Sequence, residues 1–122
     1  MRPLDALMLF GYAGGMALGQ ILFKLSADHA KLAGAGAAFW IALLRTPYFY
    51  ISVLTYAVLT LAWIWILSRM EISKAYPAVA LAFVITPLLA AAVFREALNL
   101  WYFASLALIL AGLALLMWKG TV

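Results

Sequence analysis

Long apolar stretches separated by short polar segments are the feature that most limits how this chain can fold. Residues 4–25, 48–68, 75–94 and 100–118 each approach the roughly 20 residues that a helix needs to cross a bilayer core. The chain has 122 residues, of which 70% are hydrophobic and only 10% are charged. A soluble domain of this size could not bury so much apolar surface. The sequence therefore predicts one all-α integral membrane domain over residues 1–122, with four transmembrane helices.

A further apolar run, residues 33–44, lies between the first two spans. It is too short to cross a membrane, so we expect an interfacial or re-entrant helix. Pro47 ends it, because the residue before a proline is disfavoured in helical geometry. This helix serves either as a gate towards the bilayer or as a linker on the membrane surface.

Two kinds of helix-shaping residue occur inside the spans. Gly11, Gly15 and Gly19 recur every four residues on one face of the first span, a spacing that lets two membrane helices approach closely. Pro87 lies in the middle of the third span and leaves a backbone carbonyl without its helical partner. We expect the glycine face to allow movement and Pro87 to kink a wall of a transport path, with a simple packing role as the alternative for each.

Gln20 and Lys24 follow the last glycine, four residues apart on nearly the same helix face. An amide and a cation near the end of a membrane helix are expensive unless they have a role or a partner. Either Lys24 extends to the headgroups while Gln20 bonds a neighbouring helix, or the two hold an anionic headgroup. Arg45 and Arg95 are further candidate anion ligands, and Tyr76 lies at the predicted mouth of the path.

The residue groupings that carry enzyme chemistry are missing from the sequence. It has no nucleophile–base pair, metal-ligand cluster or phosphate loop, and the carboxylates all lie at or beyond the ends of the spans. We therefore expect no enzyme activity, no cofactor and no metal. The single histidine, His29, falls in a predicted polar turn over residues 26–31 and is expected to be solvated. The basic residues are too few and too scattered to indicate a nucleic-acid partner.

Basic residues are divided evenly between the two predicted sides of the membrane. The side with the termini carries Arg2, Arg69, Lys74 and Lys119, and the other side carries Lys24, Lys31, Arg45 and Arg95. The positive-inside rule therefore gives no preferred orientation. Either two oppositely oriented copies form an antiparallel, dual-topology homodimer, or a partner such as a paralogous four-span subunit fixes the orientation. A stripe of small residues in the last span fits a helix contact within or between chains; it comprises Ala104, Ala107, Ala111 and Ala114.

Short motifs along nearly the whole chain resemble a known family. They are G-Q-x-x-x-K at residues 19–24, A-Y-P at 75–77, R-E at 95–96 and A-G at 111–112. This order resembles the drug/metabolite transporter superfamily, and more closely its four-span EamA-like members. Those members include the small subunits of the undecaprenyl-phosphate aminoarabinose flippase. The sequence is more distantly similar to the small multidrug resistance exporters.

One departure from the exporters narrows the function that the resemblance implies. The exporters carry an essential glutamate three residues before the glycine that matches Gly19, and this chain has Met16 there. The flippase-type relatives share the residues that match Gly19, Gln20 and Lys24. The resemblance thus implies movement of a polyprenyl-phosphate or polyprenyl-phosphate-linked sugar across a bacterial inner membrane. The alternatives are a small-molecule or cation exporter, and a non-transporting assembly subunit of a membrane glycosyltransferase.

Overall fold

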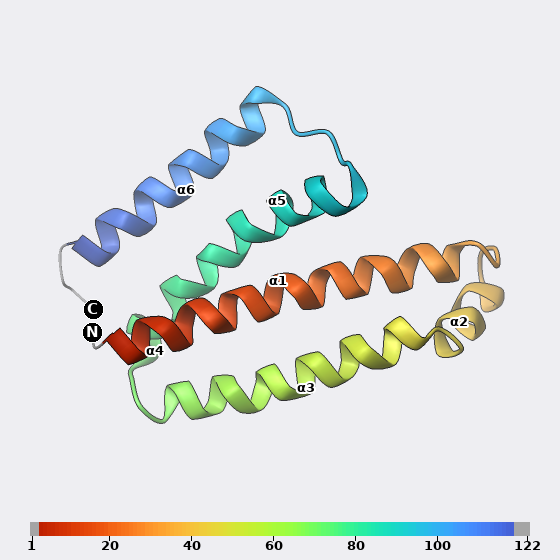
Figure 1. Ribbon diagram of the computed structural model, residues 1–122, viewed down its shortest axis with the longest axis horizontal. Helices are drawn as coiled ribbons and strands as arrows, with labels where there is room; N and C mark the ends of the chain where they lie inside the picture. Colours follow the sequence, from red (N-terminus) through yellow and green to blue (C-terminus); the bar gives the residue numbers. More distant parts are fainter. Residues whose placement is uncertain (1–2, 119–122) are drawn as a thin grey trace.

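The computed structural model describes residues 3–118, and these fold as helices joined by short turns (Figure 1). In chain order they are α1 (Pro3–Lys31), α2 (Ala37–Leu44), α3 (Pro47–Leu67), α4 (Ile72–Ala75), the 3-10 helix η1 (Tyr76–Leu81), α5 (Ala82–Phe94) and α6 (Leu100–Trp118). Four helical segments are long and apolar enough to cross a membrane: α1, α3, residues 72–94 and α6. The predicted all-α, four-span class is confirmed. Arg2 and Lys119 of the charge comparison lie outside the described residues.

Helix α1 extends further than the sequence predicts. Residues 26–31, expected to form a polar turn, continue the helix to Lys31. The Ser26 hydroxyl donates to the Leu22 carbonyl at 2.8 Å and lies 3.5 Å from the Ser52 hydroxyl of α3, so this buried polar group is satisfied inside the helix pair. With 29 residues, α1 is about 43 Å long, more than the roughly 30 Å of a bilayer core. Its last turns therefore reach the headgroup layer.

The contact between α1 and α3 is the most extensive one in the bundle, and the two helices lie side by side in Figure 1. Its pairs, from the termini towards α2, are Leu9 with Ile66, Tyr12 with Trp63, Gly15 with Leu59, Gly19 with Tyr56, and Ser26 with Ser52. Along α3, the residues of these pairs are three and four residues apart in turn, which is the period of a left-handed coiled coil. Gly15 and Gly19 thus fit α3 of the same chain, whereas Gly11 faces open space.

The third span is interrupted at its start and not at the predicted proline. Residues 76–81 form the 3-10 helix η1, with Pro77 in its first turn. Pro87 lies inside α5, which runs without a break from Ala82 to Phe94. Because Pro77 and Pro87 both lack an amide hydrogen, each removes a helical bond, but only the first coincides with a change of helix type.

Helix α6 is loosely attached, on the far side of α5 from the α1–α3 pair (Figure 1). Only Leu106 and Leu113, seven residues apart, are buried on it. All four members of the small-residue stripe are exposed: Ala104, Ala107, Ala111 and Ala114. The stripe therefore makes no close contact within the described part of the chain.

Replacing Gly19 by alanine should destabilise the protein, because the new Cβ would overlap the Tyr56 ring. We expect a loss of about 1–2 kcal/mol in unfolding free energy, measured by denaturant titration in detergent. Gly11→Ala is the matched control, since its Cβ meets nothing and it gains the same helix propensity. Equal stability of the two variants would contradict the packing described for Gly19.

Candidate functional site

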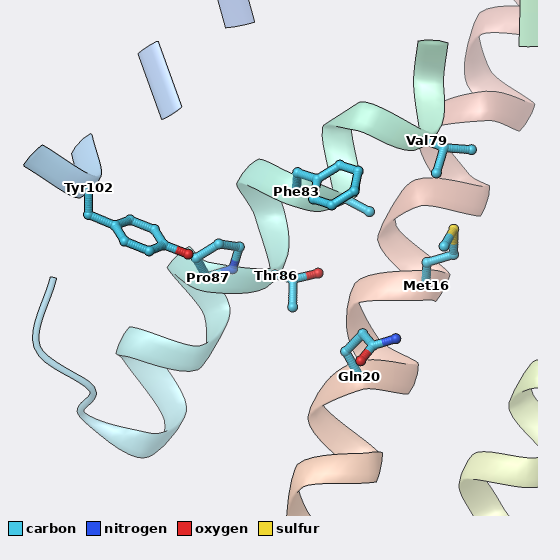
Figure 2. Close-up of a pocket in the computed structure, with 8 residues that line it drawn as sticks. Met16, Gln20, Val79, Phe83, Thr86, Pro87 and Tyr102 are labelled. Carbon is cyan, nitrogen blue, oxygen red and sulfur yellow. The ribbon is translucent and has the colours of Figure 1, made fainter. Parts of the chain in front are cut away.

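A cleft of about 420 Å³ lies between α1, α5 and the start of α6. Its walls are Met16, Gln20, Val79, Ala82, Phe83, Thr86, Pro87 and Tyr102. Figure 2 shows Met16 and Gln20 on α1, and across from them Val79 of η1, Phe83, Thr86 and Pro87 of α5, and Tyr102 of α6. The volume is in the range of small-molecule sites, which combine mostly apolar walls with a few placed polar groups.

The polar wall of the cleft is held in place from behind by Tyr56 of α3. Gln20 Nε2 donates to the Tyr56 hydroxyl at 2.6 Å, and that hydroxyl donates to the Met16 carbonyl at 3.3 Å. The Tyr56 ring stacks on Phe23 with centroids 4.7 Å apart. Because the bond to Tyr56 uses the Gln20 amide nitrogen, the Gln20 carbonyl oxygen remains available to accept a bond from a ligand.

The cleft carries no charged side chain among its described lining residues. Its polar atoms are the amide of Gln20 and the hydroxyls of Thr86 and Tyr102. Met16, at the position where the exporters have glutamate, is part of the wall, so that position does face the cleft but with a neutral thioether. An uncharged polar cleft suits hydroxyl-bearing ligands better than a permanent organic cation, which would need a nearby carboxylate.

The structure distributes the remaining predicted site residues around this cleft. Lys24 is not in its wall but forms an ion pair with Asp28, Nζ to Oδ1 3.0 Å, with both side chains about half exposed. Tyr76 is exposed, and its ring packs edge-to-face with that of Trp63, with the two ring centroids 6.2 Å apart. Arg95 ends α5 in left-handed geometry (φ 55°). Of the residues predicted to bind substrate, only Gln20 lines the cleft. Of the residues predicted to shape or pack the helices, only Pro87 lines it.

Arg45 lies apart from the cleft. It lines a different cavity, between the end of α1 and α2. The two cavities share no lining residue.

The sequence analysis does not identify two residues at the cleft, Tyr102 in its wall and Tyr56 behind it. Tyr102 is part of the cleft wall, although its place at the start of the last span fits an aromatic belt equally well. Tyr56 is partly buried in the middle of an apolar span, where a phenol needs a hydrogen-bond partner, and this is the signal that could have singled it out. Its partners come from α1, which the local sequence does not reveal.

Comparison with known proteins gives a consistent group of relatives. A probable 4-amino-4-deoxy-L-arabinose-phosphoundecaprenol flippase subunit ArnE from Pseudomonas aeruginosa is 40% identical over 99 residues, 81% of this chain and 84% of that protein. Proteins of the same name from two strains of Pseudomonas fluorescens are 31% identical over 99 residues, with the same coverage, and 29% identical over 113 residues, 93% of this chain and 96% of that protein. No family model and no solved structure matches the chain.

Four helices long and apolar enough to span a membrane, together with these relatives, define a membrane transporter subunit and not an enzyme. The chain is a multi-pass protein of the bacterial inner membrane. Within that class, it belongs to the ArnE family of flippase subunits. The resemblance seen in the motifs is thereby confirmed, and the exporter and glycosyltransferase-subunit alternatives are not favoured.

Replacing Tyr56 by phenylalanine should remove both hydrogen bonds of the phenol while keeping its ring on Gly19 and Phe23. We expect a loss of about 1–2 kcal/mol in unfolding free energy, because the Gln20 amide and the Met16 carbonyl each lose a partner. Tyr48→Phe is the control, since Tyr48 contacts His29 through its ring. A Tyr56→Phe variant as stable as the Tyr48→Phe variant would show that these bonds do not hold the cleft wall.

Proposed function

We propose that this chain is one subunit of a flippase that moves a phosphoundecaprenol-linked sugar across the inner membrane. The observation that carries the proposal is the uncharged polar cleft formed by Gln20, Thr86 and Tyr102 beside Met16. The substrate class follows the name of the relatives, which specifies 4-amino-4-deoxy-L-arabinose. The sugar occupies the cleft, and the isoprenoid tail remains in the surrounding lipid.

The groups in the cleft match the hydroxyls of a pentose, and they offer its amino group a hydrogen-bond acceptor but no counter-charge. The Gln20 carbonyl oxygen accepts a bond from the amine or a hydroxyl, and the hydroxyls of Thr86 and Tyr102 both donate and accept. Phe83 and Met16 offer apolar contact to the faces of the ring. Because these bonds replace those that the sugar makes with water, the cleft lowers the cost of taking the sugar into the membrane.

Lys24 is the proposed ligand for the phosphate. It lies four residues beyond Gln20 on nearly the same face of α1, about 6 Å nearer the membrane surface. A lysine is a compact cation suited to phosphate, and its pair with Asp28 is half exposed, a kind of pair that contributes well under 1 kcal/mol. A phosphate can therefore replace Asp28 as the partner of Lys24 at little cost.

In this proposal, the segment from Tyr76 to Arg95 forms the wall of the path that faces Gln20, and its first and last residues lie at the two ends of the path. Tyr76 opens η1 at the end of the bundle that holds the termini, and Arg95 closes α5 at the other end. We place Tyr76 at the mouth of the path and Arg95 as a second cation for the phosphate on the side of Lys24. Pro87 shapes the middle of this wall.

A second four-span subunit completes the transporter in this proposal. The relatives are named as flippase subunits, and α6 presents its alanine stripe away from its own chain. Small residues on a lipid-facing helix allow a second helix to approach closely. The second subunit is either a paralogue or another copy of this chain in the opposite orientation, as the even distribution of basic residues permits.

Replacing Thr86 by valine should slow transport about fivefold to tenfold, because the cleft keeps its shape but loses one hydroxyl. Gln20→Ala should have a similar or larger effect, and Lys24→Met a loss of more than tenfold. The assay is transbilayer movement of a labelled phosphoundecaprenol-linked aminosugar in liposomes that contain the purified protein with its co-expressed partner.

Thr60→Val is the matched control for the cleft threonine. Thr60 lies on α3, is exposed to the lipid and bonds only to its own helix, at the Tyr56 carbonyl 2.8 Å away. Its variant should transport at the normal rate. If Thr86→Val and Gln20→Ala transported as fast as Thr60→Val, the cleft would not be the path.

Replacing Ala111 by phenylalanine should weaken the association of the two subunits, because a large side chain would separate helices that approach through the alanine stripe. We expect most of the co-purified partner to be lost, measured by affinity purification of the tagged chain. Leu108→Phe is the control, because Leu108 is also exposed on α6 but already has a large side chain. This variant should keep the partner. Retention of the partner by Ala111→Phe would exclude this face, and recovery of an untagged copy of the chain would identify a homodimer.

A further inference from the structure

A second cavity, of about 520 Å³, lies under α2 where that helix folds back on the end of α1. Three side chains that can donate hydrogen bonds line it: Arg45, His29 and Thr46. The rest of its wall is made by alanine, isoleucine and proline side chains. Nothing in the proposed transport path uses this cavity.

Local features of the sequence fix the shape of this cavity. Gly34 and Gly36 have positive φ values of 114° and 67°, which residues with a side chain rarely adopt, and they turn the chain back into α2. At the other end of α2 the buried Thr46 donates to the Ala42 carbonyl at 2.8 Å. His29 is exposed, as the sequence predicts, and its ring also contacts Tyr48 of α3 in an edge-to-face arrangement with centroids 5.6 Å apart.

The position of the cavity separates it from the cleft. His29 is nine residues from Gln20 on α1, which places the two on opposite sides of the helix and about 14 Å apart along its axis. This end of α1 reaches the headgroup layer. On α2 the large apolar side chains are exposed, with Trp40 at 63% and Leu44 at 58%, as expected for a helix at the boundary between headgroups and acyl chains.

From this arrangement we propose that the cavity binds the phosphate of an anionic bilayer phospholipid, distinct from the transported lipid. Arg45 forms no ion pair within residues 3–118, so its guanidinium is available to a phosphate, which it matches with two parallel hydrogen bonds. His29 adds a second donor from the facing helix. The lipid phosphate anchors α2 at the membrane surface.

A lipid fits this cavity better than free phosphate does. A free phosphate dianion would meet a largely apolar wall with one permanent cation, whereas a phosphodiester carries one charge and brings acyl chains to the exposed face of α2. Basic pockets beside transmembrane helices bind anionic headgroups in this way.

Native mass spectrometry of the detergent-purified protein, titrated with phosphatidylglycerol, tests the proposal. We expect about tenfold weaker binding in Arg45→Gln and about threefold weaker binding in His29→Gln, with phosphatidylcholine binding weakly throughout. Arg69→Gln is the matched control, because Arg69 lies over Trp65 at the other end of the bundle. It should bind phosphatidylglycerol like the unchanged protein.

Each other outcome would overturn the proposal. Equal binding by Arg45→Gln and Arg69→Gln would exclude the cavity, provided that thermal unfolding shows both variants folded. Displacement of phosphatidylglycerol by millimolar inorganic phosphate would identify a free-anion site. Stronger binding of undecaprenyl phosphate than of phosphatidylglycerol, lost in Arg45→Gln, would assign the cavity to the transported lipid. These measurements involve no transport, so their failure would leave the proposed flippase function untouched.

Discussion

The close approach of Tyr56 to Gly19 is the contact on which the functional part of the structure depends. Because Gly19 has no side chain, the ring of Tyr56 can lie against α1. Only from there does its hydroxyl reach both the Gln20 amide and the Met16 carbonyl. The packing of the two helices and the orientation of the Gln20 amide, the proposed sugar ligand, therefore depend on the same contact. A change in either one alters the other.

Helix α1 packs against both α3 and the η1–α5 segment, and α6 is the loosely attached part of the bundle. Helices α1 and α3 interlock along their length through the glycines, stacked aromatic rings and paired serines. The η1–α5 segment packs on α1 about as extensively as α3 does, whereas α6 makes far fewer contacts, chiefly with η1 and α5.

The sequence was a good guide to what depends on the bilayer and a poor one to what depends on tertiary packing. Length and hydropathy alone located four spans, because lipid imposes them. They did not reveal that residues 26–31 continue α1, where the hydroxyl of Ser26 bonds within its own helix and lies against Ser52 of α3. In the cleft, Gln20 was foreseen as a polar residue in an apolar span. The sequence does not single out Tyr102 in the cleft wall or Tyr56 behind it, because the position of each depends on contacts with other helices.

The absence of ionisable carboxylate, amine, guanidinium and imidazole groups from the described wall of the cleft has a thermodynamic consequence for the proposed transport. The cleft itself therefore offers the cargo no carboxylate that would exchange it for a proton. In the proposed path, coupling to the proton gradient would have to use the ionisable groups outside the cleft, Lys24 with its partner Asp28. Without such coupling, net flow follows the difference in chemical potential of the lipid-linked sugar between the two leaflets.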